Sequence, residues 1–103
     1  MIVKNKRLRS KKITDSARGQ NCTLRIPGVC NFNPETTVFA HDNGAGIALK
    51  AHDIHGCYAC SDCHNWYDSH FSAWKVAHRD AEFFRAMKET QSKLIQKGLI
   101  KIS

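Results

Sequence analysis

Five cysteines in a chain of 103 residues constrain the fold more than any other feature. The count is odd, so a closed set of disulfides would leave one cysteine unpaired. A domain of this size buries only about 60–65% of the surface of its unfolded chain, and a bound metal is a common source of extra stability. We therefore interpret the cysteines mainly as metal ligands, with disulfides as the alternative.

The spacing of the cysteines indicates one zinc site. Cys60 and Cys63 form a Cys-x2-Cys knuckle, in which two thiolates can hold one tetrahedral zinc. Cys22 and Cys30 flank a Pro-Gly turn signal and are predicted to supply the other two sulfurs. Four cysteines would close the coordination shell, so this zinc would be structural and would tie residues 22–30 to residues 60–63.

Cys57 leaves an alternative open, because it also stands at x2 spacing from Cys60. We prefer the pair Cys60/Cys63, since a histidine-bearing helix follows Cys63 at once. Cys57 would then be a small buried thiol.

The net charge of +7 is concentrated at the N-terminus, where six Lys and Arg residues precede the first acid, Asp15. Residues 1–13 are predicted to be a flexible basic arm, and residues 14–103 one domain. A basic arm suits contact with nucleic-acid phosphates, although a solubilising terminus is the alternative. The sequence has no run of about 18 apolar residues and no secretory signal, so we expect a cytoplasmic protein without a membrane partner.

The expected elements form an α+β pattern. Short helices are predicted at residues 15–20 and from 61 or 62 to 69, and strands at residues 22–26 and 36–41. Residues 42–56 are predicted to be loop, and residues 99–102 a short closing strand. A long helix, or two joined helices, is predicted over residues 72–97, stopped by Gly98. Its core stripe is predicted to contain Trp74, Ala77, Ala81, Phe84, Met87, Gln91, Leu94 and Ile95.

A second constellation combines histidines with an acid. His64 and Asp68 are four residues apart on one face of the predicted helix, so both can hold one metal, which we expect to be Zn²⁺, Mg²⁺ or Mn²⁺. His41 ends the strongest predicted strand and would face this pair. A neutral histidine can accept a proton from water, and a metal can stabilise the leaving oxygen of a phosphodiester.

Other interpretations of these residues stay open. His41 could be a surface histidine, His64 could be a ligand of the first zinc, and Asp68 could be a solvated acid. His70 lies about 240° round the helix from His64 and is a weak candidate. The remaining histidines, His52, His55 and His78, are expected at the surface.

Three segments together resemble a known family: residues 22–30, residues 33–41 and Cys60-Ser-Asp-Cys-His64 with Asp68. They are similar to small phage and prophage proteins described as HNH-type, or ββα-metal, nucleases. The family is related to a phage nuclease that acts together with the RecA recombinase. The resemblance covers roughly residues 16–102.

The resemblance implies a zinc-stabilised ββα-metal (HNH-like) domain with a long C-terminal helix. His41 corresponds to the general base of the motif, and His64 and Asp68 to ligands of a catalytic divalent metal. Asp53 stands where the family often has asparagine, and Ala40 where it often has a ligand.

The sequence therefore predicts a metal-dependent endonuclease that hydrolyses DNA in phage recombination or replication, leaving 5′-phosphate ends as the resemblance implies. DNA would be its partner, with a recombinase as a further one, and no small-molecule substrate is expected. The alternative is a zinc-stabilised DNA-binding module without catalysis, which the alanine at position 40 favours. A weaker alternative is a protein-recruiting accessory factor, for example one that docks on a recombinase.

Overall fold

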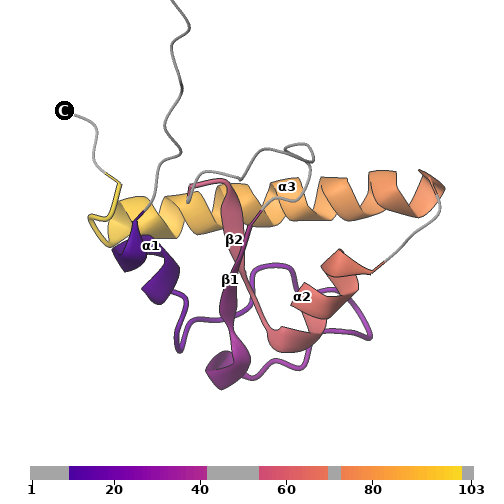
Figure 1. Ribbon diagram of the computed structural model, residues 1–103, viewed down its shortest axis with the longest axis horizontal. Coiled ribbons are helices and arrows are strands. Elements are labelled where there is room, and N and C mark those ends of the chain that lie inside the picture. The colour runs from indigo at the N-terminus through magenta and orange to yellow at the C-terminus, as the bar shows by residue number, and fades with distance from the viewer. Residues whose placement is uncertain (1–9, 42–53, 70–72, 101–103) are drawn as a thin grey trace, which may run out of the picture.

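The structure, a computed structural model, describes residues 10–41, 54–69 and 73–100, and it shows a two-stranded sheet packed against one long helix (Figure 1). Strands β1 (Val38–His41) and β2 (Gly56–Ala59) are antiparallel, and β2 contacts helix α3 (Ala73–Gln96). The shorter helices are α1 (Lys11–Asp15), the 3-10 turn η1 (Pro34–Thr36) and α2 (Ser61–Asp68). The prediction of a small α+β domain with a long C-terminal helix is confirmed.

The hairpin pairs Val38 with Ala59 at one end and His41 with Gly56 at the other. A side chain at Gly56 would collide with the ring of Phe39, so the close approach of the strands requires glycine here. The loop prediction over residues 42–56 is wrong at this end, because Gly56 begins β2. Residues 42–53 lie outside the described part of the chain.

The first part of the chain differs from the predictions. Helix α1 begins after Ser10, whose side chain accepts the N–H of Ile13, so it lies earlier than the helix predicted at residues 15–20. The helix takes in residues 11–13 of the predicted arm, while the domain boundary stays a prediction. No strand forms over residues 22–26; Thr23 reaches the sheet, where its N–H and its hydroxyl both donate to the Tyr58 carbonyl at 2.7 Å. The predicted turn at Gly28 is present, with a φ of 76°.

Helices α2 and α3 agree closely with their predicted bounds. Cys60 caps α2 with its sulfur, which accepts the N–H of Cys63. At the end of α3, Gly98 has a φ of 73° and the N–H of Leu99 returns to the Leu94 carbonyl at 2.9 Å, a Schellman motif. Leu99 and Ile100 are not in a strand, and the rest of the predicted closing strand lies outside the described residues.

The predicted core stripe of α3 is wrong at four of its eight members. Phe84 and Ile95 keep 55% and 53% of their surface exposed, and Ala77 and Ala81 are exposed as well. Leu94 is buried as predicted, Met87 and Gln91 are half-buried, and the side chain of Trp74 is not among those described. The buried face consists instead of Phe83, Ala86, Thr90 and Leu94.

Thr90 is buried on this face because its hydroxyl is fully bonded. Its oxygen lies 3.1 Å from the Tyr58 nitrogen and 3.1 Å from the Thr23 hydroxyl. The Thr23 hydroxyl donates to the Tyr58 carbonyl at 2.7 Å, so the Thr90 hydroxyl donates to Thr23 and accepts from Tyr58. The network joins α3, β2 and the segment that follows α1.

Within the described ranges, no helix has the length and apolar character needed to cross a membrane.

Candidate functional site

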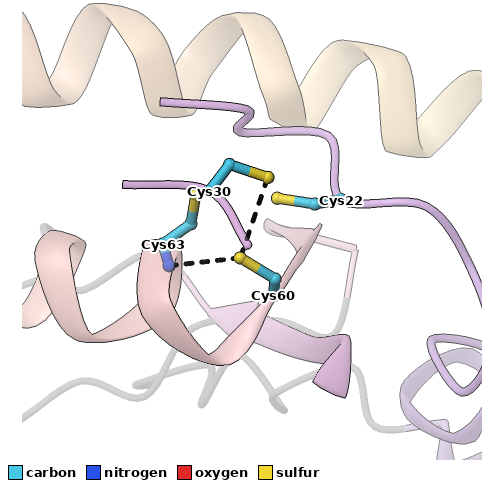
Figure 2. Close-up of side chains that lie close together, drawn as sticks. All are labelled: Cys22, Cys30, Cys60 and Cys63. Atoms are coloured by element: carbon cyan, nitrogen blue, oxygen red, sulfur yellow. Dashed lines mark hydrogen bonds between the residues drawn. The ribbon is translucent and has the colours of Figure 1, made fainter. Parts of the chain in front are cut away.

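Four cysteine sulfurs lie together at the junction of two distant segments (Figure 2). Cys22 and Cys30 come from the irregular chain after α1, and Cys60 and Cys63 come from the start of α2. All four sulfur atoms lie within 4.8 Å of one another, and the Cys30 and Cys60 sulfurs are 3.9 Å apart. The cluster is the one predicted from the spacing, and the pairing of Cys60 with Cys63 rather than Cys57 is what the geometry shows.

The size of this cluster fits zinc. Four thiolates at about 2.3 Å from a tetrahedral zinc lie roughly 3.8 Å from one another. The 3.9 Å separation of Cys30 and Cys60 agrees with this value, and all five cysteines are unlinked by disulfides. The disulfide alternative therefore has no support in the structure, and the cluster could hold one zinc ion.

Backbone N–H groups point at every sulfur of the cluster. Cys22 accepts from Arg25 at 3.4 Å, Cys30 from Phe32, Cys60 from Asn31 and Cys63, and Cys63 from Ile26. The N–H groups of Arg25 and Phe32 face their sulfurs because these residues have φ values of 47° and 55°. These values lie in the left-handed region of the backbone, which residues other than glycine rarely adopt. Such donors stabilise negative charge on sulfur, which is the state that binds metal.

Burial and hydrogen bonding act in opposite directions on the thiols. Burial raises the pKa values of Cys30 and Cys63. Burial also acts to raise the pKa of Cys60, but hydrogen bonds from the Asn31 and Cys63 N–H groups and from neighbouring thiols outweigh it, so this pKa is lowered. Because its pKa is lowered while theirs are raised, Cys60 ionises more readily than Cys30 or Cys63.

Asn31 joins the two halves of the cluster outside the sulfurs. Its side-chain NH₂ donates to Ser61 at 3.2 Å and to Asp62 at 3.1 Å, both in the first turn of α2. Its side-chain oxygen accepts the Asn33 N–H at 2.8 Å. The sequence analysis missed this residue, because an asparagine in a turn region gives no sign of a partner 30 residues away.

Cys57 lies outside the cluster, as expected for a buried thiol. It is completely buried in β2 among core residues. Burial raises the pKa of this thiol to about 12. Cys57 is therefore neutral at physiological pH and packs as a small apolar side chain.

His64 and Asp68 form a pair on the outer face of α2. The Nε2 atom of His64 lies 3.3 Å from an Asp68 carboxylate oxygen, and their side chains are 38% and 45% exposed. Cys63 and Tyr67, which directly precede His64 and Asp68 in the sequence, are buried. Tyr67 stacks on Phe83 of α3 with ring centroids 4.3 Å apart. This packing fixes the rotation of α2 and turns the His64–Asp68 face toward solvent.

His41 occupies the opposite end of the hairpin from the start of α2. It pairs with Gly56, whereas α2 follows Ala59, which pairs with the first residue of β1. Its ring contacts Phe39 edge-on, with centroids 5.2 Å apart. Among residues 10–41, 54–69 and 73–100, the four cysteines are the group of three or more side chains close enough to hold one metal, and His41 does not form such a group with His64 and Asp68. Its role as a base stays a prediction.

Two of the histidines that were expected at the surface, His55 and His78, are exposed. The ring of His78 contacts that of Trp66 edge-on, with centroids 6.3 Å apart. His52, Asp53 and His70 lie outside the described residues. Ala40, the residue before His41, is completely buried.

Comparison with known proteins identifies the family of the chain. The family model described as "Putative nuclease YbcO" matches residues 11–99. The chain belongs to the YbcO family. Two YbcO proteins described by the same words, from Escherichia coli K12 and Enterobacteria phage 82, are each 41% identical to it over 91 residues, or 84% of this chain and 93% of theirs.

A solved structure has the same fold. It is titled "Structure of a putative bacteriophage protein from Escherichia coli str. K-12 substr. MG1655" and is 37% identical in sequence. It matches 82% of this chain and 98% of its own length with a TM-score of 0.66. The resemblance to phage and prophage nucleases noted in the sequence is thus confirmed at the level of the YbcO family.

Proposed function

We propose that this YbcO-family chain is a metal-dependent endonuclease that hydrolyses DNA phosphodiester bonds during phage recombination or replication. Family membership supports the nuclease class, since the relatives carry that description. The observation that carries the proposal is the exposed His64–Asp68 pair, which immediately follows a cluster suited to structural zinc. The fold would be a variant of the HNH, or ββα-metal, arrangement of two strands and a helix.

The cysteine cluster is proposed to hold zinc without taking part in chemistry. Its four sulfurs leave no open coordination position for water or substrate. They would fix the first turn of α2 relative to the segment 22–30 and so hold the next helical turn, with its two candidate ligands, in place.

The spacing of the pair on α2 suits a second divalent ion, Zn²⁺, Mg²⁺ or Mn²⁺. Two ligands about 2.1 Å from one ion lie roughly 3.0–3.4 Å apart in octahedral or tetrahedral geometry. The measured separation of the His64 nitrogen and the Asp68 oxygen is 3.3 Å. Both side chains are accessible, so phosphate oxygens and water could fill the remaining positions.

His41 is proposed to accept the proton of the attacking water. A neutral imidazole nitrogen can accept a proton from water. The bound ion would stabilise charge on the phosphate and on the leaving oxygen. The basic N-terminal residues would add affinity for the DNA backbone, and the products would carry 5′-phosphates.

A second candidate, a DNA-binding module without catalysis, is favoured by Ala40. This residue is completely buried and has no ligand atom, so it cannot complete a metal shell beside His41. Such a module would bind DNA with a steep dependence on salt and would cut it with none of the three metals. A recombinase is proposed as a further partner of either form.

The test is nicking of supercoiled plasmid by the purified chain with Mg²⁺, Mn²⁺ or Zn²⁺. His41→Ala is expected to lower nicking at least roughly 100-fold, the lower limit for loss of a general base. His64→Ala and Asp68→Ala are each expected to lower nicking as well, because each removes one ligand of the catalytic ion. Asn65→Ala is the matched control, because Asn65 is exposed on the same helix beside His64. Zinc content and circular dichroism would verify the fold of each variant.

Nicking by all three folded variants at the rate of Asn65→Ala would refute the assignment. Absence of nicking by the wild-type chain under every metal, with salt-dependent DNA binding retained, would establish the binding module instead.

A further inference from the structure

A cavity of about 250 Å³ lies between the segment that carries the first two cysteines and the second half of α3. Its lining includes Asn21, Arg25, Phe32, Pro34, Glu89 and Lys93. This volume is below the roughly 300–1,000 Å³ of sites for drug-sized ligands, so it suits one small ring system. Cys22 also lines it, so the cavity adjoins the cysteine cluster but does not include the His64–Asp68 pair.

Phe32 is the unusual element of this cavity. Its side chain is 76% exposed, more than any other large apolar residue in the described ranges. The cysteine cluster accounts for its left-handed backbone, because the Phe32 N–H donates to Cys30. Glycine or asparagine would meet that backbone requirement at less cost, so the cluster does not explain an aromatic ring at this position. An exposed ring face beside a cavity offers a stacking surface.

The polar side chains of the cavity suit a nucleotide. Arg25 donates two hydrogen bonds to Glu89, at 2.8 and 2.9 Å, so these two charges compensate each other. Lys93 lies one turn further along α3 and supplies a cation for a phosphate. A neutral base fits the wall near Cys22 better than a phosphate does, because four thiolates on one zinc leave a net negative charge there.

We infer that this cavity binds an unpaired nucleotide of single-stranded DNA, with the base stacked on Phe32 and the adjacent phosphate held by Lys93. Stacking on aromatic side chains requires a base whose face is free, which excludes the interior of a duplex. The inference rests on the proposed DNA substrate and specifies its form: a single strand, or a duplex with a single-stranded end or gap. The cavity would bind this strand away from the hydrolytic pair.

The test measures binding without cleavage, in the zinc-loaded His64→Ala chain, by fluorescence anisotropy of a labelled oligo-dT. Phe32→Ala is expected to weaken binding roughly 5- to 150-fold, the range for loss of one stacked base. Phe32→Tyr should keep wild-type affinity, because it keeps the ring. Phe84→Ala is the matched control, since Phe84 is an exposed phenylalanine that does not line the cavity.

Two further readouts separate stacking from a change in fold. An oligonucleotide containing 5-iododeoxyuridine should crosslink to Phe32 under light, as mapped by mass spectrometry. Lys93→Gln should lower the slope of log affinity against log salt by about 0.7, the value for one phosphate contact with a single strand.

Equal affinities of Phe32→Ala and Phe84→Ala, both with full zinc content, would overturn the inference. So would a loss of duplex affinity by Phe32→Ala as large as its loss of single-strand affinity. Failure of the proposed hydrolysis gives a different result, in which the wild-type chain does not nick plasmid yet binding to oligo-dT still depends on Phe32.

Discussion

The buried hydroxyl of Thr90 allows a prediction whose size follows from the hydrogen bonds around it. Thr90→Val keeps the shape of the side chain but removes one donor and one acceptor. The Tyr58 N–H would then be buried without a partner, which costs about 1–3 kcal/mol, and the Thr23 hydroxyl would lose one of its two bonds, about 1 kcal/mol. We expect the free energy of unfolding to fall by about 2–4 kcal/mol.

Thr90→Ser provides the control, because it keeps the hydroxyl and loses one methyl group, at a cost of roughly 1 kcal/mol. Thermal unfolding with saturating zinc measures both variants. For a domain of about 100 residues, 2–4 kcal/mol corresponds to a decrease in Tm of about 8–30 °C. If the valine variant is as stable as the serine variant, the assignment of the hydroxyl network is incorrect.

Three further predictions concern the pKa values and the end of α3. Burial raises the pKa of Cys57 to about 12 from the 9.0 of a free thiol, so the free energy of unfolding should fall as pH rises from 9 toward 12. Cys57→Ala should reduce this fall, as measured by urea unfolding at each pH. The hydrogen bonds from Arg25 lower the pKa of Glu89, so Glu89→Gln should lower the free energy of unfolding by up to about 1 kcal/mol at pH 7. This loss should become progressively smaller as pH falls below the 4.5 of a free glutamate, and an equal loss at pH 3 would argue against the pair. Gly98→Ala should destabilise the chain by about 1 kcal/mol, measured by chemical unfolding, because Gly98 has a φ of 73°; an unchanged midpoint would contradict the Schellman end.

Sequence reasoning located the features that depend on local spacing. The Cys-x2-Cys knuckle at Cys60 and the glycine stop at Gly98 each depend on a few neighbouring residues, and both are present. The helix bounds of α2 and α3 followed from the same local signals. These features could be predicted because neither needs knowledge of a distant partner.

Apart from the sulfur cluster, features that depend on distant partners were not predicted. The alternation in residues 22–26 is typical of a strand, but Arg25 leaves the extended region to direct its N–H at Cys22. The buried face of α3 includes Thr90, whose polarity hides it from a search for apolar periodicity, while Phe84 fits the periodicity and is exposed. Strand β2 is only four residues long and all four of its residues are buried, so it lacks an alternating pattern.

The candidate site divides in the same way. The sulfur cluster was predicted from the Cys-x2-Cys spacing and from the turn between Cys22 and Cys30, and the His64–Asp68 pair from its spacing of four residues on a helix. In the structure the four sulfurs lie together, and so do the two side chains of the pair. The cavity beside Phe32 has no sequence signal, because its walls come from segments more than 50 residues apart.

The C-terminal turn after α3 has a consequence for how the protein is made. Ile13 and Ala17, in and just after the first helix, share a core cluster with Leu94, and Leu99 and Ile100 pack against it; Figure 1 shows α1 beside the yellow end of the chain. A helix of five residues is unstable by itself. During translation α1 therefore stays undocked until Leu94 and the turn after it have left the ribosome.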